Sequence, residues 1–383
     1  MINLNDTQIS NLIKFRQTIH SLAELSGEEK QTANLIANRL RNLENFILSE
    51  NVGGYSILAV YDSGKPGKTI MFRADIDALP IDEINNFEYK SINKNVAHKC
   101  GHDGHLTVLV GFAEWINLNP PKSGKIILLF QASEENGKGA NNVLNDIAFT
   151  DINPDYVFAF HNLPGFPLNE IVIKEGTFTA SVSSMIFRLK GKTSHAAEPE
   201  NGINPTYAIA EIIDFIKELN IYEVEDPDFF LATPIYAKIG EKAYGTSAEN
   251  AEIHYTFRAW ESSLLENNLN FIKNKIQSIA ENHQLEVYIE TLDVFHNTNN
   301  HSEAVNLIRE AAKKTNLDMK ECQLPFKWGE DFGLFTQKFK GAMFCIGAGE
   351  NSPALHHADY DFPDEIIATG ISVFKNISIL INK

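Results

Sequence analysis

Three apolar runs, each followed closely by side chains that can bind a metal or move a proton, constrain the fold of this chain most. They are Lys125-Ile-Ile-Leu-Leu-Phe130 before Gln131-Ala-Ser-Glu134-Glu135, Asp155-Tyr-Val-Phe-Ala-Phe160 before His161, and Ala342-Met-Phe-Cys-Ile-Gly347 before Leu355-His356-His357. Such runs are typical of central parallel strands covered by helices on both faces. A further strand is predicted at Thr69–Arg73, with Asp75 just beyond it. We therefore predict an α/β fold whose mostly parallel, mixed sheet gathers these side chains outside its carboxyl edge.

The middle of the chain has a different pattern. Alternating strands are predicted at 182–189 and 252–258, a short strand at 285–290, and amphipathic helices at 208–219 and about 263–282. This order indicates a small α+β layer with one sheet face exposed. We predict a discontinuous larger α/β domain, residues 1–178 and 294–383, interrupted by an inserted domain at 179–293. The N-terminal region, about 7–48, is predicted to be helical from its apolar periodicity.

The segment His98-Lys-Cys-Gly-His-Asp-Gly-His105 concentrates potential metal ligands. Its eight residues hold three imidazoles, one thiol and one carboxylate, separated by Gly101 and Gly104. Glycine allows positive φ and close backbone approach, so neighbouring side chains can converge on one point. We predict that Cys100 and His102 bind metal as a thiolate and a neutral imidazole. The alternative is a His-rich surface loop in which Cys100 is a small buried hydrophobic residue.

Further ligands must come from other segments. The candidate ligands are the pair in this segment and three side chains at strand ends: Cys100, His102, Glu135, His161 and His356. Five ligands exceed a closed four-coordinate structural site, whereas two ions that share the Cys100 thiolate would use them all. Because hydrolysis also needs a proton shuttle that is not a ligand, we predict that Glu134 faces the attacking water. The alternative is that Glu134 and Glu135 are two solvated glutamates after a strand.

Composition limits the class of protein. With 383 residues, 43% of them hydrophobic and 22% charged, the chain resembles an ordinary globular protein of about two domains. A net charge of −17 argues against a nucleic-acid partner, because phosphate contacts require clustered Lys and Arg. Three widely spaced cysteines do not suggest a disulfide framework and suit a reducing compartment. The N-terminus lacks a signal-peptide pattern, and no apolar run approaches the roughly 20 residues that span a bilayer. We expect a cytoplasmic protein without a membrane partner.

Five motifs occur in order along the chain. They are Arg73-Ala-Asp-Ile-Asp-Ala-Leu-Pro80, His98-Lys-Cys-Gly-His-Asp-Gly-His105, Gln131-Ala-Ser-Glu-Glu135, His161-Asn-Leu-Pro-Gly165 and Leu355-His-His-Ala-Asp-Tyr-Asp-Phe362. Together they resemble the motifs of the metal-dependent amidohydrolase and aminoacylase–carboxypeptidase family. The resemblance is to the branch that contains hippurate hydrolases, auxin-conjugate hydrolases and N-acetyl-diaminopimelate deacetylase.

The resemblance implies specific roles. Two Mn²⁺ or Zn²⁺ ions per subunit would be bound by Cys100, His102, Glu135, His161 and His356. Glu134 would be the general base, and His356 is preferred to His357 because the motif places its ligand directly after Leu355. Asp75 and Asp103 match positions expected to orient the ligands and tune their basicity. Arg73 either shares this role or is structural, and the lone His20 of the N-terminal helix is expected to be structural.

The segment Lys190-Gly-Lys-Thr-Ser-His195-Ala-Ala-Glu-Pro199 resembles part of the family's lid and dimerisation domain. The resemblance implies that His195 stabilises the tetrahedral oxyanion, often in the partner subunit, and that the chain forms a homodimer or larger homo-oligomer. Arg258 is a candidate for binding a substrate carboxylate, because its rigid fork matches that group. The alternatives are a loop histidine without a role and an ordinary exposed strand arginine.

The chain also departs from the family's pattern. Gly245 stands where relatives usually have an Asn that could contact substrate, so the family's substrate preferences need not transfer. Glu330 and Asp331 resemble part of a family motif, but the sequence assigns them no chemical role.

The expected activity is hydrolysis of an N-acyl amino acid or small peptide-like amide to an acid and an amine. Glu134 would move the proton, while the metals and His195 would stabilise the oxyanion. A di- or tripeptidase or carboxypeptidase with the same site is the alternative enzyme, and a metal-stabilised binding protein is the alternative outside catalysis. The presence of Glu134 beside a complete ligand set favours an enzyme. A cytidine-deaminase-like site is excluded because its Pro-Cys-x-x-Cys segment is absent.

Overall fold

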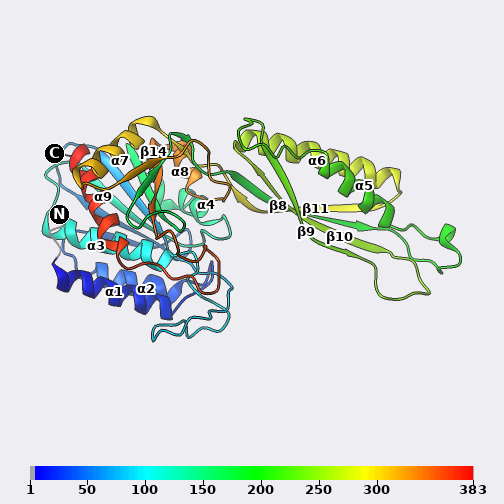
Figure 1. Cartoon of the computed structure of the whole chain (residues 1–383), viewed down its shortest axis with the longest axis horizontal. Coiled ribbons are helices and arrows are strands. Elements are labelled where there is room, and N and C mark those ends of the chain that lie inside the picture. Colours follow the sequence, from blue (N-terminus) through cyan, green and yellow to red (C-terminus); the bar gives the residue numbers. More distant parts are fainter. Residues whose placement is uncertain (1–4, 383) are drawn as a thin grey trace. The chain divides into compact units, whose positions relative to one another are not determined.

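The computed structural model describes residues 5–382, so the first four residues of the N-terminus considered above lie outside it. Two compact units make up the chain (Figure 1). The first contains the chain up to Phe178, Thr298–Gln323 and the chain from Asp331 onward. The second contains Thr179–Asn297 and Leu324–Glu330. These bounds differ from the expected ones at 294–297 and 324–330, which belong to the second unit rather than to the first.

An eight-stranded mixed sheet forms the centre of the first unit, in the order β1–β2–β4–β3–β5–β14–β6–β13. Its strands are β1 (Ile47–Val52), β2 (Ser56–Asp62), β3 (Thr69–Asp75), β4 (Lys125–Gln131), β5 (Tyr156–Leu163), β6 (Ile171–Ile173), β13 (Met319–Glu321) and β14 (Gly341–Gly347). The neighbours β4, β3, β5 and β14 pair in parallel, whereas β1–β2, β2–β4 and β14–β6 are antiparallel. The predicted mostly parallel, mixed sheet is therefore confirmed. Its central strands are almost entirely buried, as their apolar runs predict.

Helices cover this sheet (Figure 1). They are α1 (Asp6–Ser21), α2 (Lys30–Leu40), α3 (His102–Leu118), α4 (Gly139–Leu144), α7 (Ser302–Lys314), α8 (Gly333–Lys338) and α9 (Ile366–Ile381), with the 3-10 turn η1 (Ile147–Phe149). A small ladder pairs β7 (Gly176–Thr177) with β12 (Asn299–Asn300). The prediction of helix throughout about 7–48 is wrong, because a turn separates α1 from α2 and β1 begins at Ile47. Gly27, with a φ of 84°, lies in that turn and supplies a backbone conformation that other residues disfavour.

The second unit is a four-stranded antiparallel sheet in the order β11–β8–β10–β9, with two long helices on one face (Figure 1). Its elements are β8 (Ser181–Lys190), the 3-10 turn η2 (Pro199–Asn201), α5 (Thr206–Lys217), β9 (Phe230–Ile239), β10 (Asn250–Ala259), α6 (Ser262–Asn282) and β11 (Glu286–Phe295). This confirms the predicted smaller α+β layer. Strand β9 was not predicted; it is an edge strand that is exposed from Thr233 onward and contains Pro234. Proline lowers the strand signal because it cannot donate to a sheet, and at an edge it is tolerated.

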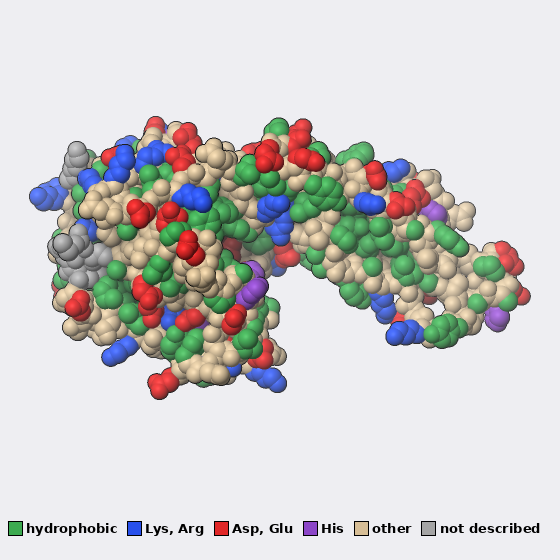
Figure 2. Space-filling model, in the orientation of Figure 1, with side chains coloured by type: hydrophobic (Ala, Val, Ile, Leu, Met, Phe, Trp, Pro, Cys, Tyr) green, Lys and Arg blue, Asp and Glu red, His purple; other side chains and the backbone are tan. Residues whose placement is uncertain are grey.

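Figure 2 shows acidic side chains scattered over the visible surface of both units, with basic side chains among them. The net charge of −17 reflects the excess of acidic over basic side chains in the sequence. Across residues 5–382, no helix has the length and apolar character needed to cross a membrane.

The two glycines of the His98–His105 segment are required for different structural reasons. Gly101 caps the start of α3 with a φ of 98°, in the left-handed region that favours glycine. Gly104 lies within the first turn of α3, where a Cβ atom would overlap the ring of buried Phe362. The second half of this segment is therefore helical, and its close packing against Phe362 depends on the missing side chain.

We expect Gly104→Ala to destabilise the protein by about 1–3 kcal/mol, because the added methyl group overpacks a buried contact. Urea unfolding of the full chain measures this. Gly245→Ala is the matched control, since its Cβ would meet nothing within 4 Å. Equal stability of the two variants would contradict the predicted overlap.

Candidate metal centre

The predicted ligands come from four regions of the first unit. Cys100 precedes α3, His102 is the first residue of α3, Glu135 follows β4, His161 lies in β5, and His356 lies in the loop after β14. The structure gathers their ligand atoms into two groups that share Cys100. One group is Cys100, His102 and His161, and the other is Cys100, Glu135 and His356. Within each group all ligand atoms lie within 4.8 Å of one another.

Two of the distances between these ligand atoms are too long for hydrogen bonds and suit divalent ions, whereas Cys100 Sγ and His161 Nε2 lie within hydrogen-bond distance at 3.5 Å. Glu135 Oε1 lies 3.7 Å from His102 Nε2 and 3.8 Å from His356 Nε2, both longer than a hydrogen bond. Two metal–ligand bonds of about 2.0–2.2 Å each can span such separations. Among the described residues, buried His102 Nε2 has no hydrogen-bond partner. A thiol, three imidazoles and a carboxylate that converge in this way form a suitable donor set for Zn²⁺ or Mn²⁺.

The electrostatics of the site favour added positive charge. Burial raises the pKa of the Cys100 thiol well above its ordinary value, and the charge of Glu135 adds to the rise. Burial alone lowers the pKa of His102, but the nearby carboxylates of Asp75, Asp77 and Glu135 outweigh it and raise this pKa to about 10. A cation held by Cys100 would reverse this balance, because a coordinating thiol is deprotonated.

Asp77 orients two of the predicted ligands, a role that was not predicted from the sequence. Its backbone oxygen lies 3.0 Å from His102 Nδ1 and its Oδ1 lies 3.2 Å from the same nitrogen. Its Oδ2 accepts a hydrogen bond of 3.0 Å from the Glu135 backbone N–H. With Nδ1 engaged in this way, His102 presents Nε2 to the centre. The available signal was that Asp77 follows Asp75 by two residues just past β3.

Asp75, which was predicted to orient ligands, lies 2.6 Å from His105 Nδ1 and 3.8 Å from His102 Nε2. Its other oxygen accepts a hydrogen bond of 2.7 Å from Arg73. Asp75 therefore contacts the imidazole of His105, which is not a predicted ligand, and contributes negative charge close to His102.

Asp103, the other residue predicted to orient ligands, is bound from helix α1. Arg16 Nη1 donates to its carboxylate at 3.0 Å, and His20 Nδ1 lies 2.8 Å from the same oxygen. Burial lowers the pKa of His20, but hydrogen bonds to Asp103 and Glu83 outweigh burial and raise it to about 9. Arg16 also donates to Asp361, five residues past His356, at 2.9 Å. Helix α1 thus links the first turn of α3 to the C-terminal ligand segment.

Two residues beside the centre have left-handed backbone conformations that non-glycine residues rarely adopt. His356 has a φ of 66°, and its backbone N–H donates to the Lys99 carbonyl at 2.8 Å. Ser133, directly before Glu134, has a φ of 61°. The carboxylate of buried Glu29 holds it by accepting hydrogen bonds from the Ser133 N–H at 2.8 Å and the Ser133 hydroxyl at 3.3 Å. Such strain persists where surrounding contacts enforce it, commonly at functional sites.

The remaining predicted site residues belong to the second unit. His195 Nδ1 accepts a hydrogen bond of 3.1 Å from the Ala197 N–H, so the proton of the neutral ring is on Nε2. Gly245 accepts a hydrogen bond from the Ala196 N–H, which places it beside the His195 loop. Arg258 donates to the Lys327 carbonyl at 2.8 Å, and burial lowers its pKa.

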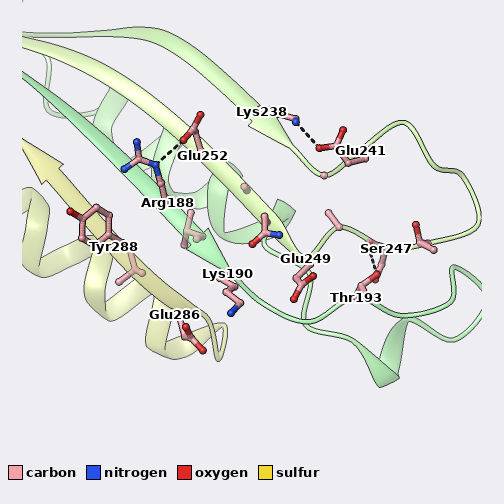
Figure 3. Close-up of a pocket in the computed structure, with 17 residues that line it drawn as sticks. Arg188, Lys190, Thr193, Lys238, Glu241, Ser247, Glu249, Glu252, Glu286 and Tyr288 are labelled. Atoms are coloured by element: carbon pink, nitrogen blue, oxygen red, sulfur yellow. Dashed lines mark hydrogen bonds and ion pairs between the residues drawn. The ribbon is translucent and has the colours of Figure 1, made fainter.

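A groove of about 670 Å³ lies over the ends of β8, β10 and β11 in the second unit (Figure 3). Several of its charged side chains pair with one another. Arg188 contacts Glu252 at 3.0 Å and Lys238 contacts Glu241 at 2.6 Å. The predicted metal ligands belong to the first unit and do not line this groove, so the candidate centre is a separate feature.

We expect Glu29 to make the free energy of unfolding pH-dependent. Burial raises its pKa from 4.5 to about 7, and the charge of Asp77 adds to the rise. A carboxyl group with a raised folded-state pKa holds its proton more tightly in the fold. Its stabilising contribution is therefore complete below pH of about 4.5 and is lost as pH rises towards about 7.

Urea unfolding of the wild type and Glu29→Gln between about pH 4.5 and 8 tests this. Relative to the variant, the wild type should lose on the order of 3 kcal/mol across that range. A difference that does not change with pH would contradict the raised pKa.

Known proteins similar to this chain identify its family. The sequence model of peptidase family M20/M25/M40 matches residues 71–379. The chain is 32% identical to the hippurate hydrolase of Campylobacter jejuni, over 96% of this chain and 95% of that protein. It is 29% identical to the N-acetyldiaminopimelate deacetylase of Priestia megaterium, over 95% and 96% of the two chains.

Solved structures share the fold. A putative aminohydrolase from methicillin-resistant Staphylococcus aureus superposes with a TM-score of 0.88 at 22% identity, covering 98% of this chain and 97% of that one. A dinuclear metal-binding peptidase of the M20 family from Bacillus subtilis gives a TM-score of 0.82 at 23% identity, covering 99% of each chain. The resemblance inferred from the five motifs is confirmed, and the chain is an amide-bond hydrolase that belongs to peptidase family M20/M25/M40.

Proposed function

We propose that this chain is a di-metal amidohydrolase that cleaves the amide bond of N-acyl amino acids to a carboxylic acid and an amino acid. The observation that carries the proposal is the pair of ligand groups that share Cys100, with Glu134 beside them. Ligand atoms of His102, Glu134 and Glu135 also lie within 4.8 Å of one another. The names of the hippurate hydrolase and N-acetyldiaminopimelate deacetylase relatives support this substrate class.

The ligand set would hold two divalent ions, Mn²⁺ or Zn²⁺, through Cys100, His102, Glu135, His161 and His356. When bound, such ions supply Lewis-acid chemistry that lowers the pKa of water and polarises the scissile carbonyl. Cys100 must remain reduced to act as a ligand, which supports our proposal of a cytoplasmic location.

Glu134 is the proton shuttle in this proposal. Its side chain is buried beside Glu135, and the Ser133 backbone before it is held in one conformation by Glu29. The carboxylate takes a proton from the attacking water and then delivers it to the nitrogen of the leaving amine. Because the buried carboxylate is already held in place, it loses little orientational freedom during these proton transfers.

The second unit supplies the remaining groups in this proposal and serves as a lid and dimerisation domain. His195 donates a hydrogen bond from its Nε2–H to the developing oxyanion, either within its own chain or in the partner subunit of a homodimer. Arg258 binds the substrate carboxylate through its planar fork. Gly245 offers no side chain to the substrate, so the preferred amino acid can differ from that of relatives with Asn there.

We expect Glu134→Gln to fold and to keep two metal ions per chain but to lose about 10²–10⁴-fold in turnover. Turnover is measured on acetyl-, benzoyl- and indoleacetyl-amino acids with added Mn²⁺ or Zn²⁺, and on dipeptides to test the peptidase alternative. Metal content is measured on the same samples. If metal content falls with activity, Glu134 is a ligand. If the wild type hydrolyses none of these substrates, the result supports the alternative of a metal-stabilised binding protein.

We expect His195→Ala to keep its fold and both metals but to lose roughly 10²–10³-fold in turnover, because one oxyanion donor is removed. If His195 acts in the partner subunit, co-expression with His161→Ala should restore activity. Each mixed dimer then contains one site with both an intact ligand set and an intact donor. Verified heterodimers without recovery would rule out donation between subunits, and full activity of His195→Ala alone would remove it from the mechanism.

A further inference from the structure

We infer that Asp331 is a positioning residue that holds the Glu134 loop and sets where the Glu134 carboxylate lies. This inference rests on the proposed role of Glu134 as the proton shuttle. Asp331 is fully buried and begins the last segment of the first unit. It is far from Glu134 in sequence, and no chemical role could be assigned to it from the sequence.

The Asp331 carboxylate clamps both ends of the loop that carries Glu134. At one end, the side-chain amide of Gln131, the last residue of β4, donates to Oδ1 at 2.9 Å and Oδ2 at 2.7 Å. At the other end, the backbone N–H of Ala140, in the first turn of α4, donates to Oδ2 at 2.8 Å. The intervening residues 132–139 include Glu134 and Glu135. One side chain therefore fixes the base of this loop.

The backbone of Asp331 also contacts Glu134. Its N–H donates a long hydrogen bond of 3.4 Å to Glu134 Oε1. Because the carboxylate and the N–H belong to one residue, a shift of the clamp also moves the donor that faces Glu134. The loop needs such support, since Ser133, directly before Glu134, has a left-handed backbone conformation that non-glycine residues rarely adopt.

The Arg73 guanidinium compensates the negative charge of the buried Asp331 carboxylate. Its Nη2 donates to Asp331 Oδ1 at 2.8 Å, its Nη1 to Asp75 at 2.7 Å and its Nε to the Gln131 oxygen at 2.9 Å. Asn at position 331 would preserve the size of the side chain but replace one acceptor with a donor. That amide group would face either the Arg73 guanidinium or the Ala140 N–H. One of the two attractive contacts would therefore become a repulsion between donors.

The first test is Asp331→Asn in the full chain with metal added. We expect kcat to fall roughly 10- to 100-fold, since displacement of a catalytic group by about 1 Å costs this much. We expect KM and the metal content to change little, because Asp77 holds the Glu135 N–H independently of Asp331. The matched control is Asp155→Asn, which removes a carboxylate that accepts hydrogen bonds from Lys68 and the Thr69 N–H at the start of β3. That control should leave kcat unchanged.

A double-mutant cycle separates positioning from general damage. If Asp331 acts through Glu134, Asp331→Asn should cost little further activity in the Glu134→Gln background. The same fold-loss in both backgrounds would overturn the inference while leaving the proposed function intact. Full activity of Glu134→Gln alone would instead overturn the proposed role of Glu134.

A second variant covers the case in which Asp331→Asn does not fold. Gln131→Met keeps the charge pair of Arg73 and Asp331 but removes the amide that holds both carboxylate oxygens. Gln131→Met should lower kcat by a smaller factor than Asp331→Asn does. In the Glu134→Gln background it should have little effect on kcat. Wild-type kcat in Gln131→Met would contradict the clamp.

Discussion

Mutual repulsion among buried carboxylates is the constraint on which this site depends. Asp75, Asp77 and Glu134 are buried where β3 and β4 end, and Glu135 is nearly so. Carboxylates removed from water stay ionised only where positive charge or hydrogen-bond donors compensate them. The Arg73 guanidinium, imidazoles and a backbone N–H group lower the pKa values of Asp75 and Asp77, whereas burial raises the pKa of Glu135 to about 7. A donor set of this kind is suited to multivalent cations.

The segments that carry the ligands are far apart in sequence, and buried polar contacts hold them together. The carbonyl of Lys99, next to Cys100, accepts a hydrogen bond from the His356 N–H. Arg16 reaches both Asp103 in α3 and Asp361 beyond His356. Removal of one partner from such a network leaves a buried charge unpaired, which is strongly destabilising. The N-terminal helix is therefore part of the framework of the site, although it supplies none of the predicted ligands.

The sequence predicted those parts of the structure that local pattern determines. The central strands were predicted because their apolar runs reflect burial on both faces, and the ligand candidates were found because they follow those runs. Strand β9 was missed because Pro234 and an exposed edge weaken its pattern. The start of α3 at His102 has no capping signal in the sequence, because its N-cap is the left-handed Gly101 and no side chain caps it.

The partners of buried polar residues could not be predicted in the same way. Asp77 was visible in its motif, but its alignment with both His102 and Glu135 depends on how β3 and α3 pack. The contact between Asp331 and the Glu134 loop joins segments almost two hundred positions apart in the chain. Long-range pairing of this kind has no local periodicity, so a single sequence does not reveal it.

The assignment of Leu324–Glu330 to the second unit limits how these units can be recombined. Phe326 accepts a hydrogen bond of 2.9 Å from the Ala180 N–H, and Lys327 accepts one from Arg258, so this short segment belongs structurally with Thr179–Asn297. A chimera that exchanged only Thr179–Asn297 with a relative would place foreign partners against Phe326 and Lys327. The disturbed segment would then lead directly into Asp331. Modular exchange of the second unit therefore requires two grafts, and substitutions in that unit can be transmitted along the backbone to the residue that holds the Glu134 loop.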